Sequence, residues 1–101
     1  MSRVSGKPYY LYILWSAVGC RFYVGITEDT ETRLLQHNQG LSTWTAKFIP
    51  WEMVHREIHP DYTAARKREL LLKKQKGGNG FFRLTGLDPV VFRGENRSLD
   101  L

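Results

Sequence analysis

The stretch YYLYILWSAVGCRFYVGIT, residues 9–27, contains the strongest local signals in the chain. Two runs rich in aromatic and β-branched residues, 9–15 and 22–27, are separated by a short connector that contains Gly. Such runs favour β-strands, and a short Gly-containing connector favours a hairpin. The stretch therefore predicts two paired antiparallel strands, which bring Tyr12 and Tyr23 close together if both phenols emerge on the same face.

Downstream of this hairpin, the pattern predicts a helix, a third strand and a second helix. The first helix is capped near Asp29 and stops at Gly40, a residue type typical of the position just past a helix. Residues 51–58 form the expected third strand, and residues 62–75 form the second helix behind the cap Asp61. We therefore expect an α+β fold, a small three-stranded antiparallel β-sheet flanked by α-helices.

The C-terminal part gives weaker signals. A Gly-rich tract at 77–80 is expected to end the second helix, and Asp88-Pro89 predicts a short final helix. At 101 residues the chain has the size of one domain, so we expect a single domain over 1–101.

The charge balance favours a polyanionic partner. The formal net charge is +5 and the sequence pI is about 9.6. Basic residues crowd the second predicted helix, where Glu69 is the only acid between 66 and 76; a solvated helix face is the alternative explanation. The six basic residues there are Arg66, Lys67, Arg68, Lys73, Lys74 and Lys76.

Cysteine and apolar content bear on the compartment. The single cysteine, Cys20, excludes an internal disulfide and a cysteine-cluster metal site, and it fits a reducing compartment. No apolar run approaches the roughly 20 residues that a membrane span requires. We expect a cytoplasmic protein without a membrane partner.

Glu69 is a candidate metal ligand. On a helix it lies beside an apolar stripe that includes Ala65 and Leu72, where a carboxylate must be solvated, paired or metal-bound. A single carboxylate, together with waters and phosphate oxygens, suits Mg²⁺. A surface ion pair with Arg66 or Lys73 is the alternative.

Arg33, His37 and the two tyrosines form a second candidate group. Arg33 and His37 are four residues apart, hence on one helix face, and a guanidinium can bracket a phosphate. A phenol is a poor base at neutral pH unless cations or metal-bound water lie close, which Arg33 and a metal on Glu69 would supply. Taken singly, a surface arginine, a packed histidine and core tyrosines are the alternatives.

Together, these residues resemble the GIY-YIG nuclease domain over roughly residues 8–80, which leaves a C-terminal extension at about 81–101. That domain occurs in homing endonucleases, some restriction enzymes, the incision subunit of bacterial nucleotide excision repair and the catalytic subunit of a branched-DNA endonuclease. The first motif lacks its Gly. The resemblance rests on Tyr10-Leu11-Tyr12, Tyr23-Val24-Gly25, Arg33, His37-Asn38-x-Gly40, Thr45 and Ala64…Glu69.

The resemblance implies a metal-dependent phosphodiester hydrolase. Glu69 would hold one divalent metal, Mg²⁺ or Mn²⁺, and a water would attack the phosphorus in line to leave a 5′-phosphate and a 3′-hydroxyl. Tyr12 and Tyr23 would flank that water, and one of them would be the general base or would position it. Arg33 would stabilise the transition state.

The resemblance also implies supporting roles around this centre. His37 would support the base or a phosphate, and Gly25 would let the backbone turn closely behind Tyr23. Four further residues are expected to contact nucleic acid: Lys47, Arg66, Lys73 and Asn79.

The function that follows is that of an endonuclease, with DNA the expected substrate and DNA repair the expected setting. Two alternatives remain open: a non-catalytic nucleic-acid-binding module, and a subunit that acts only with a partner. Because the chain has no attached reader module, specificity would come from DNA shape, a homodimer contact or another protein.

Overall fold

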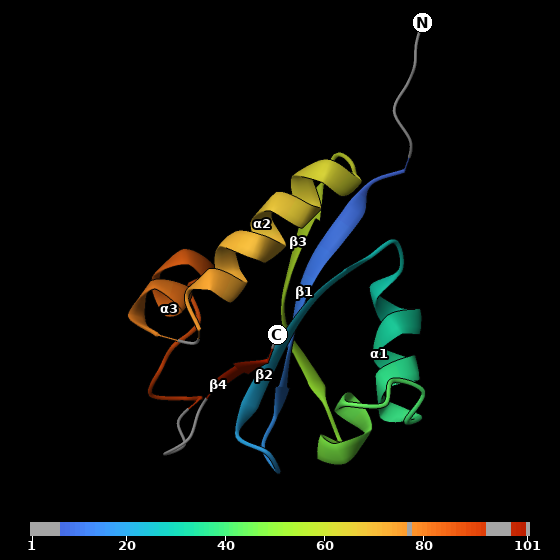
Figure 1. The fold of residues 1–101 in the computed structure, drawn as a ribbon, viewed down its shortest axis with the longest axis vertical. Helices are drawn as coiled ribbons and strands as arrows, with labels where there is room; N and C mark the ends of the chain where they lie inside the picture. The colour runs from blue at the N-terminus through green and yellow to red at the C-terminus, as the bar shows by residue number, and fades with distance from the viewer. Residues whose placement is uncertain (1–6, 77, 93–97, 101) are drawn as a thin grey trace, which may run out of the picture.

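The computed structural model describes residues 7–76, 78–92 and 98–100. A sheet of strand order β3-β1-β2-β4 forms the centre of the molecule (Figure 1). Its β3-β1-β2 part is the predicted three-stranded antiparallel sheet, which is confirmed; the short β4 adds a strand parallel to β2. In chain order the elements are β1 (Tyr9–Ser16), β2 (Arg21–Thr27), α1 (Thr30–Asn38), the 3₁₀ helix η1 (Thr45–Phe48), β3 (Glu52–His59), α2 (Tyr62–Lys74), α3 (Asn79–Thr85) and β4 (Ser98–Asp100).

The β1–β2 hairpin sets which residues share a face. Tyr12 lies opposite Gly25, and Leu14 lies opposite Tyr23. Since side chains alternate along a strand, both phenols emerge on one face, and their ring centroids are 6.2 Å apart. The predicted proximity of Tyr12 and Tyr23 is therefore confirmed.

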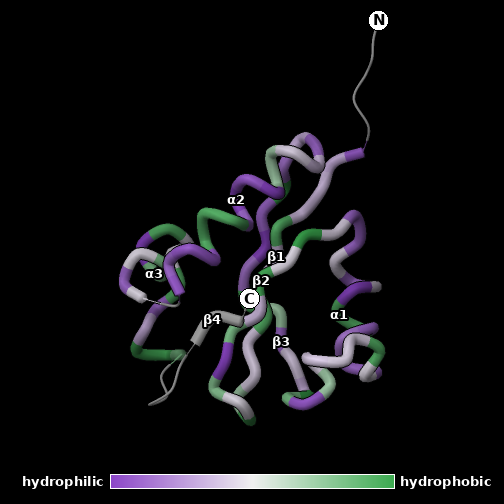
Figure 2. The backbone as a smooth tube through the Cα atoms, in the orientation of Figure 1, coloured by the Kyte–Doolittle hydropathy of each residue, from purple (hydrophilic) through white to green (hydrophobic). Residues whose placement is uncertain are grey.

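The two faces of the sheet carry separate apolar cores. One face packs under α2 and α3, and the other packs under α1 and η1 (Figure 1). In Figure 2 the tube of α2 alternates between hydrophobic and hydrophilic turns, as expected for a helix with one side against a sheet. The α2-side core contains Leu11, Ile13, Phe22, Val24, Leu72, Phe81 and Phe82, whereas the α1-side core contains Tyr12, Leu14 and Trp51.

Both predicted helix caps are present. The Asp29 carboxylate accepts a hydrogen bond from the Thr32 N–H at the start of α1, and the Asp61 carboxylate accepts one from the Ala64 N–H at the start of α2. Gly40 follows α1 with a φ of 79°, a left-handed conformation that favours glycine.

The prediction of a short final helix at Asp88-Pro89 is wrong. Asp88 opens a turn, in which its carbonyl accepts from the N–H groups of Val91 and Phe92, while the helix α3 lies earlier, at Asn79–Thr85. The reason is burial, because Phe81 and Phe82 pack against Phe22. This long-range apolar contact stabilises a short helix that local propensity does not predict.

Candidate active site

Tyr12 is packed directly over Gly25. A Cβ atom at residue 25 would lie 2.6 Å from the Tyr12 Oη and 2.7 Å from its Cζ, closer than any van der Waals contact allows. Gly25 lies within the regular strand β2, so the expected turn of the backbone behind Tyr23 is wrong. Its missing side chain instead makes room for the buried ring of Tyr12.

A chain of hydrogen bonds runs from Tyr12 into the protein. The Tyr12 Oη lies 3.0 Å from the His37 Nε2, and the His37 Nδ1 lies 2.8 Å from the Thr45 Oγ1. Tyr12, His37 and Thr45 are almost completely buried. The imidazole of His37 thus bridges Tyr12 and Thr45 inside the protein, away from solvent.

Arg33 lies on the solvent side of this chain. Its Nε donates to the Tyr12 Oη at 3.3 Å, its guanidinium interacts with the Tyr23 phenol, and its Nη1 donates to the Gln36 Oε1 at 3.1 Å. Arg33 and Tyr23 are both partly exposed. One face of the sheet thus brings together four of the five predicted catalytic side chains: Tyr12, Tyr23, Arg33 and His37.

Burial sets the protonation of this group. It raises the pKa of the Tyr12 phenol well above the usual range, aided by Tyr23 and opposed by Arg33. Burial, together with the positive charge of Arg33, lowers the pKa of His37 to about 4. At neutral pH, Tyr12 is therefore a protonated phenol and His37 a neutral imidazole.

The fifth predicted catalytic residue, Glu69, comes from α2 on the other side of the sheet. Its side chain is 8% exposed, and its two carboxylate oxygens accept from the Arg66 Nη1 at 2.6 Å and the Lys73 Nζ at 2.9 Å. The expected alternative of ion pairs with these two residues is thus present. The Glu69 carboxylate is buried, whereas the side chain of Arg66 is 45% exposed and that of Lys73 is 19% exposed. The Glu69 charge also contributes to raising the pKa of Tyr12, which links the two sides electrostatically.

The donor set around Glu69 limits the kind of metal site that is possible. Across residues 7–76, 78–92 and 98–100, no group of three or more His, Cys, Asp or Glu side chains could hold a metal ion. A single carboxylate fits Mg²⁺, which retains waters and binds substrate phosphate oxygens. For Glu69 to serve in this way, Arg66 and Lys73 must release its oxygens.

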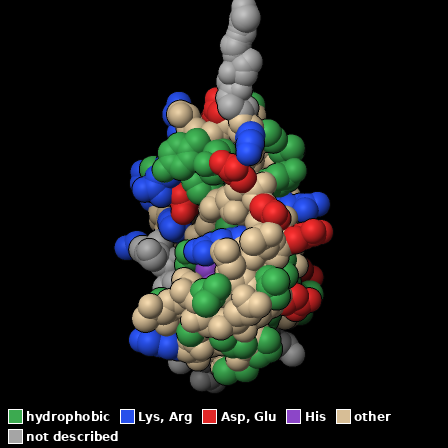
Figure 3. Space-filling model, turned by 90° about the vertical axis from the view of Figure 1, so that its right-hand side faces the viewer, with side chains coloured by type: hydrophobic (Ala, Val, Ile, Leu, Met, Phe, Trp, Pro, Cys, Tyr) green, Lys and Arg blue, Asp and Glu red, His purple; other side chains and the backbone are tan. Residues whose placement is uncertain are grey.

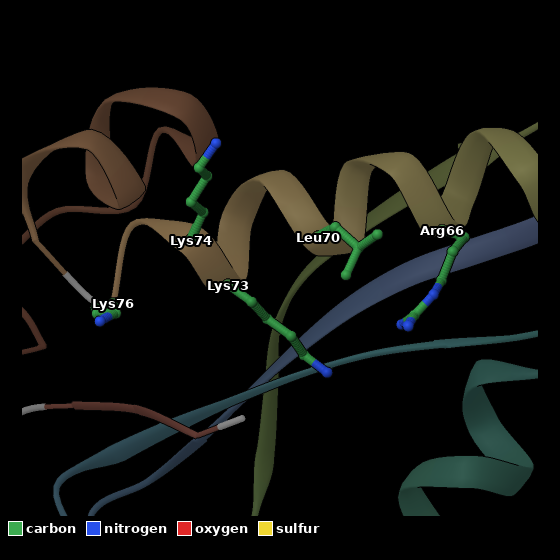
Figure 4. Close-up of a pocket in the computed structure, with 5 residues that line it drawn as sticks. All are labelled: Arg66, Leu70, Lys73, Lys74 and Lys76. Atoms are coloured by element: carbon green, nitrogen blue, oxygen red, sulfur yellow. The ribbon is translucent and has the colours of Figure 1, made fainter.

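A basic groove runs along α2 beside Glu69. It encloses about 360 Å³ and is lined by four cationic side chains and one leucine. In Figure 4, Arg66 and Lys73 extend from α2 toward the strands, whereas Lys74 extends away from them. The lining residues are Arg66, Leu70, Lys73, Lys74 and Lys76.

The predicted nucleic-acid contacts divide into two groups. Arg66 and Lys73 lie together in the basic groove along α2. Lys47 on η1 and Asn79 at the start of α3 are exposed, and they belong neither to this groove nor to the group formed by the two tyrosines, Arg33 and His37. On the α1 side of the molecule, Figure 3 shows Lys and Arg mainly along one margin and Asp and Glu mainly along the other. No helix in the described part of the chain is long and apolar enough to cross a membrane.

Thr45 is the site residue to which the sequence assigned no role. It lies eight residues beyond His37, at the first position of η1, and the sequence around it says nothing about the direction of its side chain. Its one signal in the sequence is that it is among the residues that resemble the GIY-YIG domain. The folded chain turns it inward, against the imidazole.

Comparison with known proteins agrees with this geometry. The family described as the GIY-YIG catalytic domain matches residues 8–81. A UPF0213 protein of Xanthomonas campestris pv. campestris (strain 8004) is 31% identical over 96 residues, which cover 92% of this chain and 93% of the relative. A UPF0213 protein of Enterococcus faecalis is 38% identical over 71 residues, which cover 67% and 80% of the two chains. No solved structure matches the chain significantly. The chain belongs to the GIY-YIG catalytic domain family.

Proposed function

We propose that this protein is a metal-dependent endonuclease that hydrolyses phosphodiester bonds in DNA by in-line attack of a water. Membership of the GIY-YIG family indicates a nuclease-type function in general. The single observation that carries the finer proposal is the contact of Arg33 with Tyr12 and Tyr23, which combines a fixed positive charge with two phenols at the boundary between core and solvent.

Arg33 supplies the electrostatic part of the mechanism. Its guanidinium can donate to the non-bridging oxygens of a phosphate and stabilise the charge that develops as water attacks. Because Tyr12 is 1% exposed, a substrate reaches its hydroxyl only when Arg33 or Tyr23 moves aside. Transfer of Arg33 from Tyr12 to the phosphate would open that path.

The two phenols orient the attacking water. Tyr12 is rigidly held by His37 and by the packing over Gly25, whereas Tyr23 is partly exposed and can adapt to the substrate. A nucleophile held in line with the phosphorus reacts far faster than one that must find this geometry by diffusion. The products would carry a 5′-phosphate and a 3′-hydroxyl.

Glu69 would hold the metal, Mg²⁺ or Mn²⁺. Such an ion polarises the phosphate and favours deprotonation of water. Arg66 and Lys73, released from Glu69, would be free to bind the substrate backbone along the α2 groove. Lys47 and Asn79 are proposed as outer contacts, and a protein partner or a second copy of the chain would supply specificity. A cytoplasmic role in DNA repair fits this activity.

The test compares the wild type with the Glu69→Ala and Arg33→Ala variants. Each is incubated with labelled single-stranded, duplex, flap and junction DNAs in Mg²⁺, Mn²⁺ or EDTA, and circular dichroism checks the fold. Glu31→Ala, which changes an exposed acid on the same helix as Arg33, is the matched control.

We expect cleavage that requires metal, is retained in Glu31→Ala and is lost in both site variants. Removing one such preorganised group costs about a hundredfold or more in rate. Equal activity in Glu69→Ala or Arg33→Ala would refute the role of that residue. Salt-sensitive binding without cleavage, unaffected by metal, would instead favour a non-catalytic nucleic-acid-binding module.

A further inference from the structure

The hydrogen bonds around His37 determine which of its nitrogens carries the proton. The Thr45 hydroxyl has one hydrogen and two close neighbours, the His37 Nδ1 at 2.8 Å and the Ser42 carbonyl oxygen at 3.3 Å. A carbonyl oxygen only accepts, so a Thr45 hydrogen that points to Ser42 lets the Thr45 oxygen accept from His37. If the hydrogen pointed to Nδ1 instead, the His37 hydrogen would sit on Nε2. The hydrogen of the buried Tyr12 hydroxyl would then have no acceptor on His37 or on Arg33, whose Nε also only donates, so the first arrangement holds. The Thr45 oxygen then accepts from His37, which requires a hydrogen on Nδ1.

The tautomer of His37 in turn decides the direction of the next hydrogen bond. A neutral imidazole with a hydrogen on Nδ1 has a lone pair on Nε2. The Tyr12 hydroxyl, 3.0 Å from this Nε2, must therefore donate its hydrogen inward to His37. The Tyr12 oxygen accepts from the Arg33 Nε and has no hydrogen left to offer outward.

We infer that Thr45 is a positioning residue that fixes the Nδ1–H tautomer of His37 and so makes Tyr12 the phenol that accepts a hydrogen bond from the attacking water. A phosphate oxygen only accepts, so it has no partner on Tyr12 in this arrangement, whereas a water can donate to it. Tyr23, partly exposed and outside the His37 chain of hydrogen bonds, keeps its own hydroxyl hydrogen for other contacts. This inference rests on the proposed function and assigns different roles to the two tyrosines.

The first measurement is independent of catalysis. In full-length protein labelled with ¹⁵N, long-range proton–nitrogen NMR spectra distinguish a protonated Nδ1 from a protonated Nε2. We expect His37 to carry its hydrogen on Nδ1 in the wild type and in Thr45→Ser, which keeps the hydroxyl. In Thr45→Val the Nδ1–H loses its acceptor, so we expect the hydrogen to shift to Nε2 and donate to Tyr12.

The second measurement is the split between kcat and KM. We expect Thr45→Val to lower kcat by about a hundredfold with little change in KM, because Tyr12 no longer accepts from the water. Thr45→Ser should restore most of the rate. Thr43→Val, which removes an exposed hydroxyl just before η1, is the matched control and should behave as the wild type. Tyr12→Phe should lower kcat more than Tyr23→Phe does.

The outcomes separate this inference from the proposed function. A hydrogen on Nε2 in the wild type would overturn the inference, as would a Thr45→Val protein with an unchanged tautomer or an unchanged kcat. If the wild type cleaves no nucleic acid, the proposed function fails, while the NMR spectra still decide whether Thr45 sets the tautomer of His37. A Thr45→Val protein that does not fold leaves the wild-type spectrum and the Tyr12→Phe comparison as the deciding results.

Discussion

Substitution of Gly25 by alanine should damage both the fold and the site, because the added methyl group enters the space of the Tyr12 ring. The new Cβ would lie 2.6 Å from Oη, 2.7 Å from Cζ and 3.0 Å from Cε1, whereas carbon atoms in contact are about 3.5–4.0 Å apart. The ring must retreat by about 1 Å, although it is buried and hydrogen-bonded to His37. Overpacking of this kind costs about 1–3 kcal/mol.

A smaller effect acts in the opposite direction. Alanine reduces the freedom of the unfolded chain, which returns about 0.4–1 kcal/mol at a position where the side chain fits. We therefore expect a net loss of about 1–2 kcal/mol in the free energy of unfolding. The activity should fall by about a hundredfold, since a displacement of about 1 Å at a reacting centre has that effect.

Urea denaturation measures the stability change as a shift of the midpoint at constant slope, and single-turnover cleavage measures the activity. The matched control is Gly25→Ala in a Tyr12→Leu background, where the ring is gone and the alanine should cost little. Such a double-mutant cycle isolates the contact between the two positions. A Gly25→Ala protein as stable and as active as the wild type would refute the reasoning.

Three further predictions concern charge. Burial opposes ionisation of Glu57, but hydrogen bonds from Arg68 and two neighbouring histidines lower its pKa to about 2. The resulting stability is present above the unfolded pKa of about 4.5 and is lost as pH falls toward 2. Urea unfolding curves should show a decrease of roughly 3 kcal/mol at most in the free energy of unfolding over this pH range. The Glu57→Gln variant should lack this decrease. His37, neutral in the folded protein, should show an NMR titration midpoint near pH 4; a midpoint near 6.5 would contradict its burial beside Arg33. Lys73→Ala should weaken DNA binding for all sequences and reduce the salt slope by about 0.9, as measured by fluorescence anisotropy; an unchanged slope would remove Lys73 from the interface.

Local signals in the sequence were enough to predict the hairpin, α1, α2 and their caps. Each depends on residues within a few positions of one another, such as the Asp29 carboxylate and the Thr32 N–H, or the periodicity of aromatic and β-branched residues in 9–27. The helix α3 and the strand β4 were not predicted. Phe81 and Phe82 stabilise α3 through contact with Phe22, about sixty residues earlier in the chain. Local propensity does not include such a contact, so it does not predict this helix.

Part of the candidate site could likewise be predicted from local signals, and part depended on tertiary structure. Helical spacing places Arg33 and His37 on one face of α1, and the residue types indicate phosphate chemistry. The sequence could not decide whether Tyr12 and Tyr23 share a face, because a shift of one residue in strand pairing reverses every side chain. The register that pairs Tyr12 with Gly25 decides this, since at this point of the sheet a glycine leaves space for the ring.

The sequence by itself therefore determined the fold class, the two capped helices and the set of residue types suited to hydrolysis of phosphodiesters. Only the tertiary structure decided that Thr45 lies against His37 and that Gly25 makes room for Tyr12. It also decided that Arg66 and Lys73 form ion pairs with the Glu69 carboxylate. The physical reason is range. Capping and amphipathic periodicity act between neighbours in the chain, whereas burial, hydrogen-bond direction and pKa depend on groups that meet only after the chain has folded.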